Sequence, residues 1–278
     1  TAVFFANPEL RDVEDIDYYE LACGKEKLRL ESIDNNEVFS KIEESNLNSV
    51  LAKEIMISTY TQNDERITPK TTLYEYAIFE ADYENRKYIL ILGSWFEIDK
   101  DFYEEVNNFV KRIEDFTDSN FLPPINEGEN EKDYNERVAL SNNYLVLDRK
   151  NFPVIGHEKV EVADLLTPGL EFICVKRETQ SSTLSHLFKQ GTVSARMHGR
   201  EPKYRKFIVD QISKAGSTIG YTEDTENREI RFVYAISTSK KGLIGEVIPF
   251  FSKVNLMESV KIMRELGCQV AVAKIKKL

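Results

Sequence analysis

The order of strands and helices in the second half of the chain constrains the fold more than any other feature of the sequence. Three runs rich in β-branched and aromatic residues follow one another closely, at 144–148 (YLVLD), 159–165 (KVEVADL) and 171–177 (EFICVKR). Helical patterns and further strand patterns surround them, at 133–141, from 182 onward, 203–215, 229–237, 255–266 and 269–275. This alternation predicts an α/β (α+β) fold, with a mixed sheet that helices cover in the C-terminal half.

The first half of the chain has a different pattern, typical of a smaller α+β portion. Residues 74–80 (YEYAIFE) and 87–92 (KYILIL) are strand-like runs separated by turn-forming residues, which predicts an antiparallel hairpin. The segment 119–132 holds two adjacent prolines, a glycine and several Asn and Glu residues, as linkers often do. We therefore expect an α+β portion at 1–118, a linker-like loop at 119–132 and an α/β portion at 133–278.

Charge is divided unevenly between the two halves. Residues 1–140 hold 15 basic and 32 acidic residues, a net charge of −17, whereas residues 141–278 hold 22 basic and 15 acidic residues, a net charge of +7. The asymmetry predicts an acidic portion and a basic portion that faces a polyanion. An alternative stays open, in which the two surfaces merely differ in composition.

The composition excludes several classes of protein. Hydrophobic residues make up 41% of the chain and charged residues 30%, which is typical of a globular protein. Three scattered cysteines and three histidines without metal-ligand spacing argue against disulfides and zinc, so we expect a cytoplasmic protein. We see no membrane span, signal peptide or nucleotide-cofactor motif. Because the chain begins at Thr1, a piece of a longer protein is an open alternative.

Two side chains at strand ends are the best candidates for catalysis. A short turn joins the strands that carry Asp164 and Lys176, so both are expected at the same end of the sheet. A carboxylate there binds Mg²⁺ or Mn²⁺, and a lysine stabilises the developing charge of a phosphodiester. The alternative is structural: Asp164 caps a turn and Lys176 pairs with it on the surface.

This arrangement resembles the PD-(D/E)xK nuclease superfamily, whose core is a helix, three strands, a helix and a strand. The resemblance implies a restriction-endonuclease-like portion with Asp164 as metal ligand and Lys176 as catalytic lysine. Cys174 stands where the family has its middle carboxylate. Glu136, from the preceding helix, is the expected replacement as metal ligand and catalytic group, with Glu161 and Glu171 as other candidates.

A basic segment follows these strands. Residues 176–206 hold eight basic and two acidic residues, and serines start a helical stretch whose N-terminus favours an anion. Tyr204 is a candidate for stacking on a base. An ordinary serine cap is the alternative for the helix start. The predicted phosphate-binding residues are Arg177, Ser181, Ser182, Lys189, Arg196, Arg200, Lys203, Arg205 and Lys206.

Several phrases together resemble one family: LGSWFEIDKDFYEEVN, VEVADLLT, ICVKR with SSTLSHLFKQG, and PFFSKVNL. They are similar to segments of the sporadically distributed bacterial protein family of unknown function, often found near restriction and phage-defence genes. The resemblance spans most of residues 70–278. It implies a longer protein in a mobile, defence-associated setting, in which nucleases are frequent.

These patterns together predict a nucleic-acid-binding protein of a bacterial defence or mobile-element setting. Its predicted activity is metal-dependent cleavage of DNA or RNA. Two alternatives stay open: a non-catalytic nucleic-acid-binding or sensor module, and a toxin-like interaction protein whose acidic half shields a polyanion-binding surface. DNA or RNA is the expected partner, and a membrane is not. A second copy of the chain or a defence-system protein is a further candidate partner.

Overall fold

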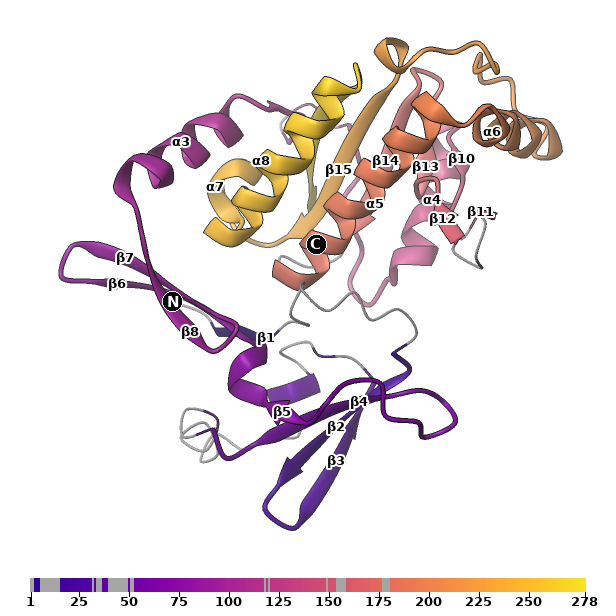
Figure 1. Ribbon diagram of the computed structural model, residues 1–278. Coiled ribbons are helices and arrows are strands. Elements are labelled where there is room, and N and C mark those ends of the chain that lie inside the picture. The colour runs from indigo at the N-terminus through magenta and orange to yellow at the C-terminus, as the bar shows by residue number, and fades with distance from the viewer. Residues whose placement is uncertain are drawn as a thin grey trace. The chain divides into compact units, whose positions relative to one another are not determined.

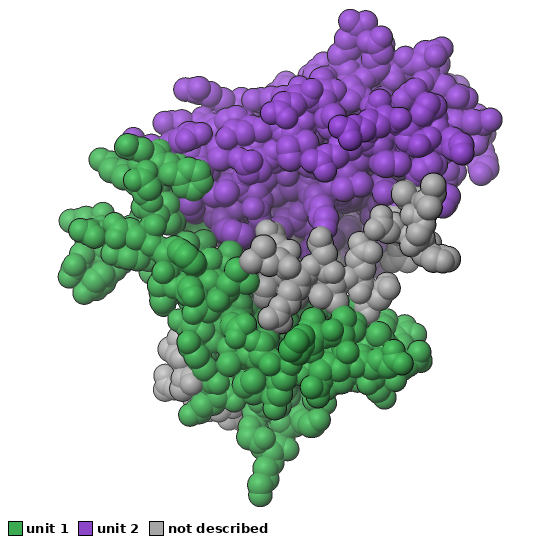
Figure 2. Space-filling view, viewed as in Figure 1, with its two compact units in different colours: residues 1–103, 180–182 green, residues 104–179, 183–278 purple. Residues whose placement is uncertain are grey.

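The computed structural model describes residues 3–5, 16–31, 33, 37–39, 50, 53–117, 119, 121–148, 150–153, 159–176 and 181–278. The chain divides into two compact units, coloured green and purple in Figure 2. Unit 1 is Thr1–Tyr103 with Gln180–Ser182, and unit 2 is Glu104–Thr179 with Thr183–Leu278. The division lies at Tyr103 and Glu104, ahead of the 119–132 segment that the sequence suggested as the linker.

Unit 1 contains two four-stranded sheets, with orders β1-β6-β7-β8 and β3-β2-β4-β5. The expected hairpin is confirmed: β6 and β7 pair antiparallel, and Glu84 and Asn85 between them both have positive φ, as a tight hairpin turn requires. The elements of this unit are β1 (Val3–Phe5), β2 (Tyr18–Cys23), β3 (Glu26–Leu30), β4 (Met56–Tyr60), β5 (Thr71–Thr72), η2 (Leu73–Tyr76), β6 (Ala77–Tyr83), β7 (Arg86–Ile91) and β8 (Ser94–Ile98).

Unit 2 is built on a six-stranded mixed sheet of order β10-β13-β14-β15-β16-β9, which confirms the predicted fold class. Strands β14, β15, β16 and β9 are parallel, and β13 is antiparallel to both of its neighbours. The strands are β9 (Glu114–Asp115), β10 (Leu145–Val146), β13 (Leu165–Leu166), β14 (Glu171–Lys176), β15 (Arg231–Thr238) and β16 (Gln269–Lys276). A separate ribbon pairs β11 (Asn151–Pro153) with β12 (Lys159–Glu161).

Helices cover the sheet of unit 2 on both faces (Figure 1). Apolar residues of α5, α6 and α8 pack on the face that includes Phe172 and Cys174, whereas α4 packs on the face that includes Ile173 and Val175. This alternation along β14 is the one that its sequence predicts. The helices are α3 (Lys100–Lys111), α4 (Glu131–Asn142), α5 (Ser181–Arg200), α6 (Pro202–Lys214), η3 (Asn227–Glu229), α7 (Ile244–Val247) and α8 (Phe250–Glu265).

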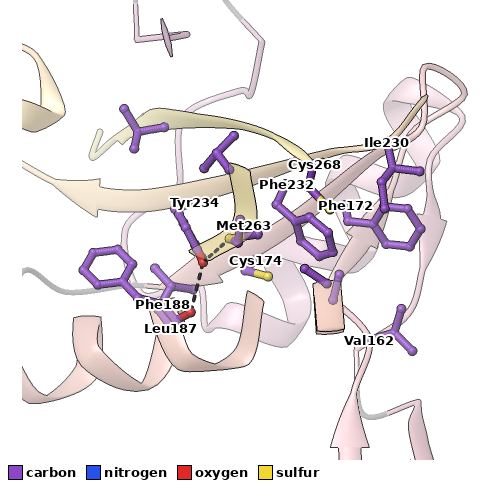
Figure 3. Packing of buried hydrophobic residues seen from close by; sticks show 14 of the residues in the cluster. Val162, Phe172, Cys174, Leu187, Phe188, Ile230, Phe232, Tyr234, Met263 and Cys268 are labelled. Atoms are coloured by element: carbon purple, nitrogen blue, oxygen red, sulfur yellow. Dashed lines mark hydrogen bonds between the residues drawn. The ribbon is translucent and has the colours of Figure 1, made fainter. Parts of the chain in front are cut away.

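Tyr234 of β15 fixes α5 and α8 on their face of the sheet (Figure 3). Its buried hydroxyl donates to the carbonyl oxygen of Phe188 at 3.0 Å and lies 3.2 Å from the sulfur of Met263. Gly191 allows this approach, because a Cβ at that position would lie 2.6 Å from the tyrosine oxygen. These contacts pack α5 and α8 closely against β15.

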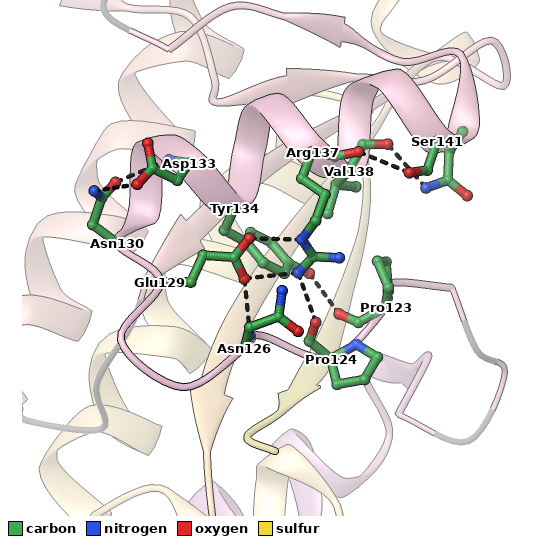
Figure 4. Close-up of polar contacts among 11 residues, drawn as sticks. Pro123, Pro124, Asn126, Glu129, Asn130, Asp133, Tyr134, Arg137, Val138 and Ser141 are labelled. Atoms are coloured by element: carbon green, nitrogen blue, oxygen red, sulfur yellow. Dashed lines mark hydrogen bonds and ion pairs between the residues drawn. The ribbon is translucent and has the colours of Figure 1, made fainter.

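The segment expected to be a linker is bound to α4 within unit 2 (Figure 4). The Arg137 guanidinium contacts both carboxylate oxygens of Glu129, at 2.6 and 2.7 Å, and also donates to the carbonyl of Pro124. The Tyr134 hydroxyl donates to the carbonyl of Pro123. Because these bonds return the segment to the helix that follows it, the proline-rich stretch is part of the packed structure.

None of the helices in the described part of the chain has both the length and the apolar character needed to cross a membrane.

Candidate metal centre and basic surface

A break between two strands determines where Asp164 lies. The run at 159–165, expected as one strand, ends as β12 at Glu161 and resumes as β13 at Leu165. In the gap, the N–H of Asp164 donates to Ile173 O, and Asp164 O accepts from the N–H groups of Leu147 and Asp148. The side-chain Oδ2 accepts from Val175 N at 2.6 Å. Four hydrogen bonds, three to its backbone and one to its carboxyl group, therefore hold Asp164 beside the C-terminal end of β14.

Asp164 lies in a group of three carboxylates. Asp148, Glu161 and Asp164 each offer one oxygen, and these oxygens all lie within 4.8 Å of one another. Asp164 is buried, while the other two side chains are half-buried. Two oxygens on opposite sides of Mg²⁺, each about 2.1 Å from it, would be about 4.2 Å apart. The spacing and the all-oxygen donor set favour Mg²⁺ or Mn²⁺ over zinc, whose sites usually include His or Cys ligands.

The environment of Asp164 favours its protonated form when no cation is bound. Burial raises the pKa of this carboxyl group to about 8, and the negative charges of Glu161, Glu131 and Asp148 act in the same direction. The hydrogen bond from Val175 N opposes them. A bound cation would replace the proton, since it favours the ionised carboxylate.

Lys176 lies at the same end of the sheet, with a different partner from the one expected. Its ammonium nitrogen is 3.5 Å from an oxygen of Glu131, in the first turn of α4. Glu136, which the sequence suggested as a ligand, is on another side of α4, where its exposed carboxylate lies 3.8 Å from Lys132. The structure does not bring Glu136 into the carboxylate group, so we leave it out of the proposed site.

The remaining carboxylates divide in the same way. Glu161, one of the alternatives considered from sequence, belongs to the group, whereas Glu171 lies at the opposite end of β14 and accepts a hydrogen bond from Thr167. Asp148 was missed in the sequence. Its signal is the same as that of Asp164, because it is a carboxylate directly after a strand-like run (YLVLD).

The basic segment forms an exposed surface on α5 and α6. Helix α5 contains no acidic residue, and Lys189, Arg196 and Arg200 recur at helical spacing along its exposed side. Lys203 and Lys206 continue the surface, one turn apart on α6. We call these five residues the α5–α6 basic surface.

The other predicted phosphate-binding residues have different surroundings. Arg205 donates to the carbonyls of His198 and Glu223, each at 2.7 Å, so it joins backbone segments. The expected stacking role of Tyr204 is wrong, because the ring is fully buried and its hydroxyl is 2.7 Å from Ser194 Oγ. Arg177 lies outside the described residues. Ser181 and Ser182 begin α5, and their side chains also lie outside the described set.

A comparison with known protein families decides where the chain belongs. Residues 1–276 match the model of a family of unknown function, DUF6119. The chain belongs to DUF6119. The match includes both units, so the family pattern covers the carboxylate group and the basic surface together. No curated protein and no solved structure matches this DUF6119 chain.

Two buried polar side chains of the DUF6119 chain also lie on the α4-covered face of the sheet. Asn135, one turn along α4 from Glu131, is fully buried, and neither its amide nitrogen nor its amide oxygen has a hydrogen-bond partner among the described residues. The same holds for the hydroxyl of Ser237, which follows Ile236, the register partner of Lys176. Each unpaired group costs about 1–3 kcal/mol, so packing alone does not account for them.

Proposed function

We propose that this DUF6119 protein is a metal-dependent phosphodiesterase that cleaves DNA or RNA. The observation that supports it best is the group of three carboxylate oxygens within 4.8 Å of one another, at the sheet end where Lys176 lies. Carboxylates in this number beside a lysine suit a hard divalent cation and an anionic substrate.

The residues of the site would bind the metal or stabilise charge on the substrate. Asp148, Glu161 and Asp164 would hold Mg²⁺ or Mn²⁺, which supplies Lewis-acid activation of a phosphate oxygen and of water when it is bound. Lys176 would stabilise the charge that develops on the phosphate, and Glu131 would keep its ammonium group at the sheet end.

Two features of the backbone and core support these proposed roles. The Val175 N–H orients the Asp164 carboxylate from the end of a buried strand, so the ligand oxygen is positioned before any ion arrives. Cys174, at the position of the missing carboxylate, is fully buried, and burial raises the pKa of its thiol well above the usual value. Asp148 and Glu161 therefore replace that carboxylate in the proposed site.

The substrate class follows from the charges around the site. The α5–α6 basic surface has no acidic residue on α5 and offers five exposed cations in the same unit as the carboxylates. Contacts of this kind go to the phosphate backbone and carry little sequence information. The defence or mobile-element setting and the cytoplasmic location stay predictions.

A cleavage assay tests the proposal directly. Single-stranded and duplex DNA and RNA would be incubated with the chain in Mg²⁺, Mn²⁺ or EDTA. We expect cleavage with either metal, none in EDTA, and a loss on the order of 100-fold or more in Asp164→Asn. Glu136→Gln is the matched control, because it neutralises an exposed carboxylate of the same unit that lies outside the group, and it should cleave normally. Equal cleavage by Asp164→Asn would refute the assignment.

A second candidate function is binding without cleavage, which the acid-free α5 helix favours on its own. It predicts that DNA or RNA binds equally well in EDTA and is never cut. Replacing Arg196, Arg200, Lys203 and Lys206 with glutamine should then lower affinity, and the salt dependence should weaken by about 0.9 in log–log slope for each lost duplex phosphate contact. An unchanged slope would count against this surface.

A further inference from the structure

We infer that a second cationic surface, at the C-terminal ends of β15 and β16, binds the phosphodiester backbone of a nucleic-acid strand that extends from the carboxylate group. We call it the lysine ledge, and it consists of Lys240, Lys241, Lys274 and Lys276. The inference rests on the proposed function for its substrate class. It adds that the substrate strand would run across the sheet end from β14 toward β16.

Parallel pairing brings the lysine ledge together from two distant parts of the chain. Strands β15 and β16 are in register with Ile236 opposite Lys274 and Thr238 opposite Lys276. Lys240 and Lys241 lie two and three residues after Thr238, in the loop that leads to α7. The first segment holds two lysines and the second holds three, with Lys277 beside Lys276, so the larger concentration of charge appears only when the two strands lie side by side.

The loop of the lysine ledge is fixed by its own hydrogen bonds. The Lys274 ammonium donates to the carbonyls of Lys240 and Gly242, at 2.9 and 2.8 Å, and the Lys240 ammonium donates to Val247 O at 3.2 Å. Gly242 has a φ of +110°, a conformation that residues with side chains rarely adopt. A loop held in this way loses little conformational entropy when it binds a ligand.

The positive charge of the lysine ledge is not neutralised within the described part of the chain. None of its four lysines forms an ion pair with a described carboxylate, although other lysines of unit 2 do, as Lys176 and Lys261 show. Two carboxylates bond to the loop, and both accept from backbone N–H groups: Glu246 from Leu243, and Asp115 from Ile244. Lys240, Lys241 and Lys276 are exposed, so they are accessible to an anionic partner.

The lysine ledge and the carboxylate group occupy the same end of one sheet. Lys176 of β14 is opposite Ile236 of β15, which is opposite Lys274 of β16. Adjacent strands are about 4.8 Å apart, so the backbones of Lys176 and Lys274 are separated by about 10 Å across the sheet. The carboxyl ends of parallel strands are also where open α/β sheets bind their ligands. A row of cations of this length suits successive phosphates of one strand, with the scissile phosphate at the Lys176 end.

Binding of a fluorescein-labelled 20-nucleotide single strand, DNA or RNA, to the full chain in EDTA tests this inference. The variant Lys240→Gln/Lys241→Gln/Lys276→Gln should bind more weakly, with a log–log salt slope lower by about 2, or about 0.7 for each of three contacts. The control Lys25→Gln/Lys70→Gln/Lys111→Gln removes the same charge from exposed positions elsewhere and should keep the slope. Because Lys240 bonds to Val247, Lys241→Glu is a second variant that leaves the loop bonds intact, and it should also weaken binding.

The outcomes separate this inference from the proposed function. An affinity and slope equal to those of the control variant would overturn the lysine ledge, even if metal-dependent cleavage is found. A lowered slope without any cleavage in Mn²⁺ would support the ledge and count against the phosphodiesterase. Equal or tighter binding to phosphatidylserine vesicles, lost in the same variants, would assign the ledge to a membrane surface and overturn the inference.

Discussion

Two sets of carboxylates in unit 2, Glu129 just before α4 and the group at 148–164 after it, differ in their surroundings. Glu129 has both oxygens bonded by the guanidinium of Arg137 and is almost completely buried. The group of Asp148, Glu161 and Asp164 instead brings three carboxylate oxygens within 4.8 Å of one another, and the nearby Lys176 lies 3.5 Å from Glu131. The first arrangement is explained by stability alone. The second gathers carboxylates at the end of a buried strand, which is typical of a site that binds a cation.

The largest expected effect is a loss of cleavage when Asp148 is replaced, a residue that the sequence analysis did not single out. Asp148→Asn should reduce metal-dependent cleavage on the order of 100-fold or more, as Asp164→Asn should, because each substitution removes one of three ligands. Rates would be measured with labelled substrate in Mn²⁺. If Asp148→Asn retains full activity while Asp164→Asn loses it, Asp148 is not a ligand and the group must be redefined.

Breaking the balanced region should affect folding instead. Arg137→Leu leaves the Glu129 carboxylate buried without its partner, at a cost of about 3 kcal/mol in the free energy of unfolding. Urea denaturation would measure the loss. Asp164→Asn, by contrast, removes a buried acid from an already negative group and should not destabilise the protein at pH 8 without metal. A large loss of stability there would indicate a structural role for Asp164.

The pKa of Asp164 predicts a pH dependence with a definite sign. Because the folded-state pKa is raised from 3.8 to about 8, protonation of Asp164 stabilises the fold below the lower value, and that stabilisation is lost as pH rises through the higher one. In the metal-free chain this contributes a slope of about 1.4 kcal/mol per pH unit at most. Urea denaturation at pH 5, 6, 7 and 8 should show stability falling with pH, and Asp164→Asn should flatten the curve. A slope that Asp164→Asn does not change would contradict the raised pKa.

The smallest expected effects separate charge stabilisation from metal binding. Lys176→Gln should lower cleavage by about tenfold to 100-fold and leave Mn²⁺ affinity within about twofold, because the ammonium is not a ligand. Glu136→Gln should change neither. Parallel measurements of Mn²⁺ titration and cleavage check both variants. A change in Mn²⁺ affinity of tenfold or more in Glu136→Gln would restore Glu136 as a ligand.

The sequence predicted the mixed sheet of unit 2 and the placing of two residues at one end of it, because alternation and turn signals are local. Asp164 and Lys176 do lie at the same sheet end. The strand-like run before Asp148 marks it as a strand-end carboxylate, but its place beside Asp164 depends on the antiparallel pairing of the two-residue strand β10 with β13. That pairing is too short to leave a clear pattern.

The choice between glutamates on α4 shows a second limit. The sequence suggested a helix from residue 133, whereas Asn130 caps it and brings Glu131 into its first turn. Successive helical residues turn by about 100°, so Glu131 and Glu136 point in directions about 140° apart. A shift of two residues in a helix start thus changes which glutamate lies near the end of the sheet.

The lysine ledge could not be predicted from the sequence for a simpler reason, since β15 and β16 are separated by the whole of α7 and α8.

Binding of Mn²⁺ to the purified chain near pH 8 tests the central claim most directly, because it depends on the carboxylate group and on no substrate. We predict one bound Mn²⁺ per chain, with proton release, and an affinity that falls at least tenfold in Asp164→Asn and rises with pH up to about 8 in the unmodified chain. Absence of binding in the unmodified chain, or unchanged affinity in Asp164→Asn, would contradict the metal centre at Asp148, Glu161 and Asp164.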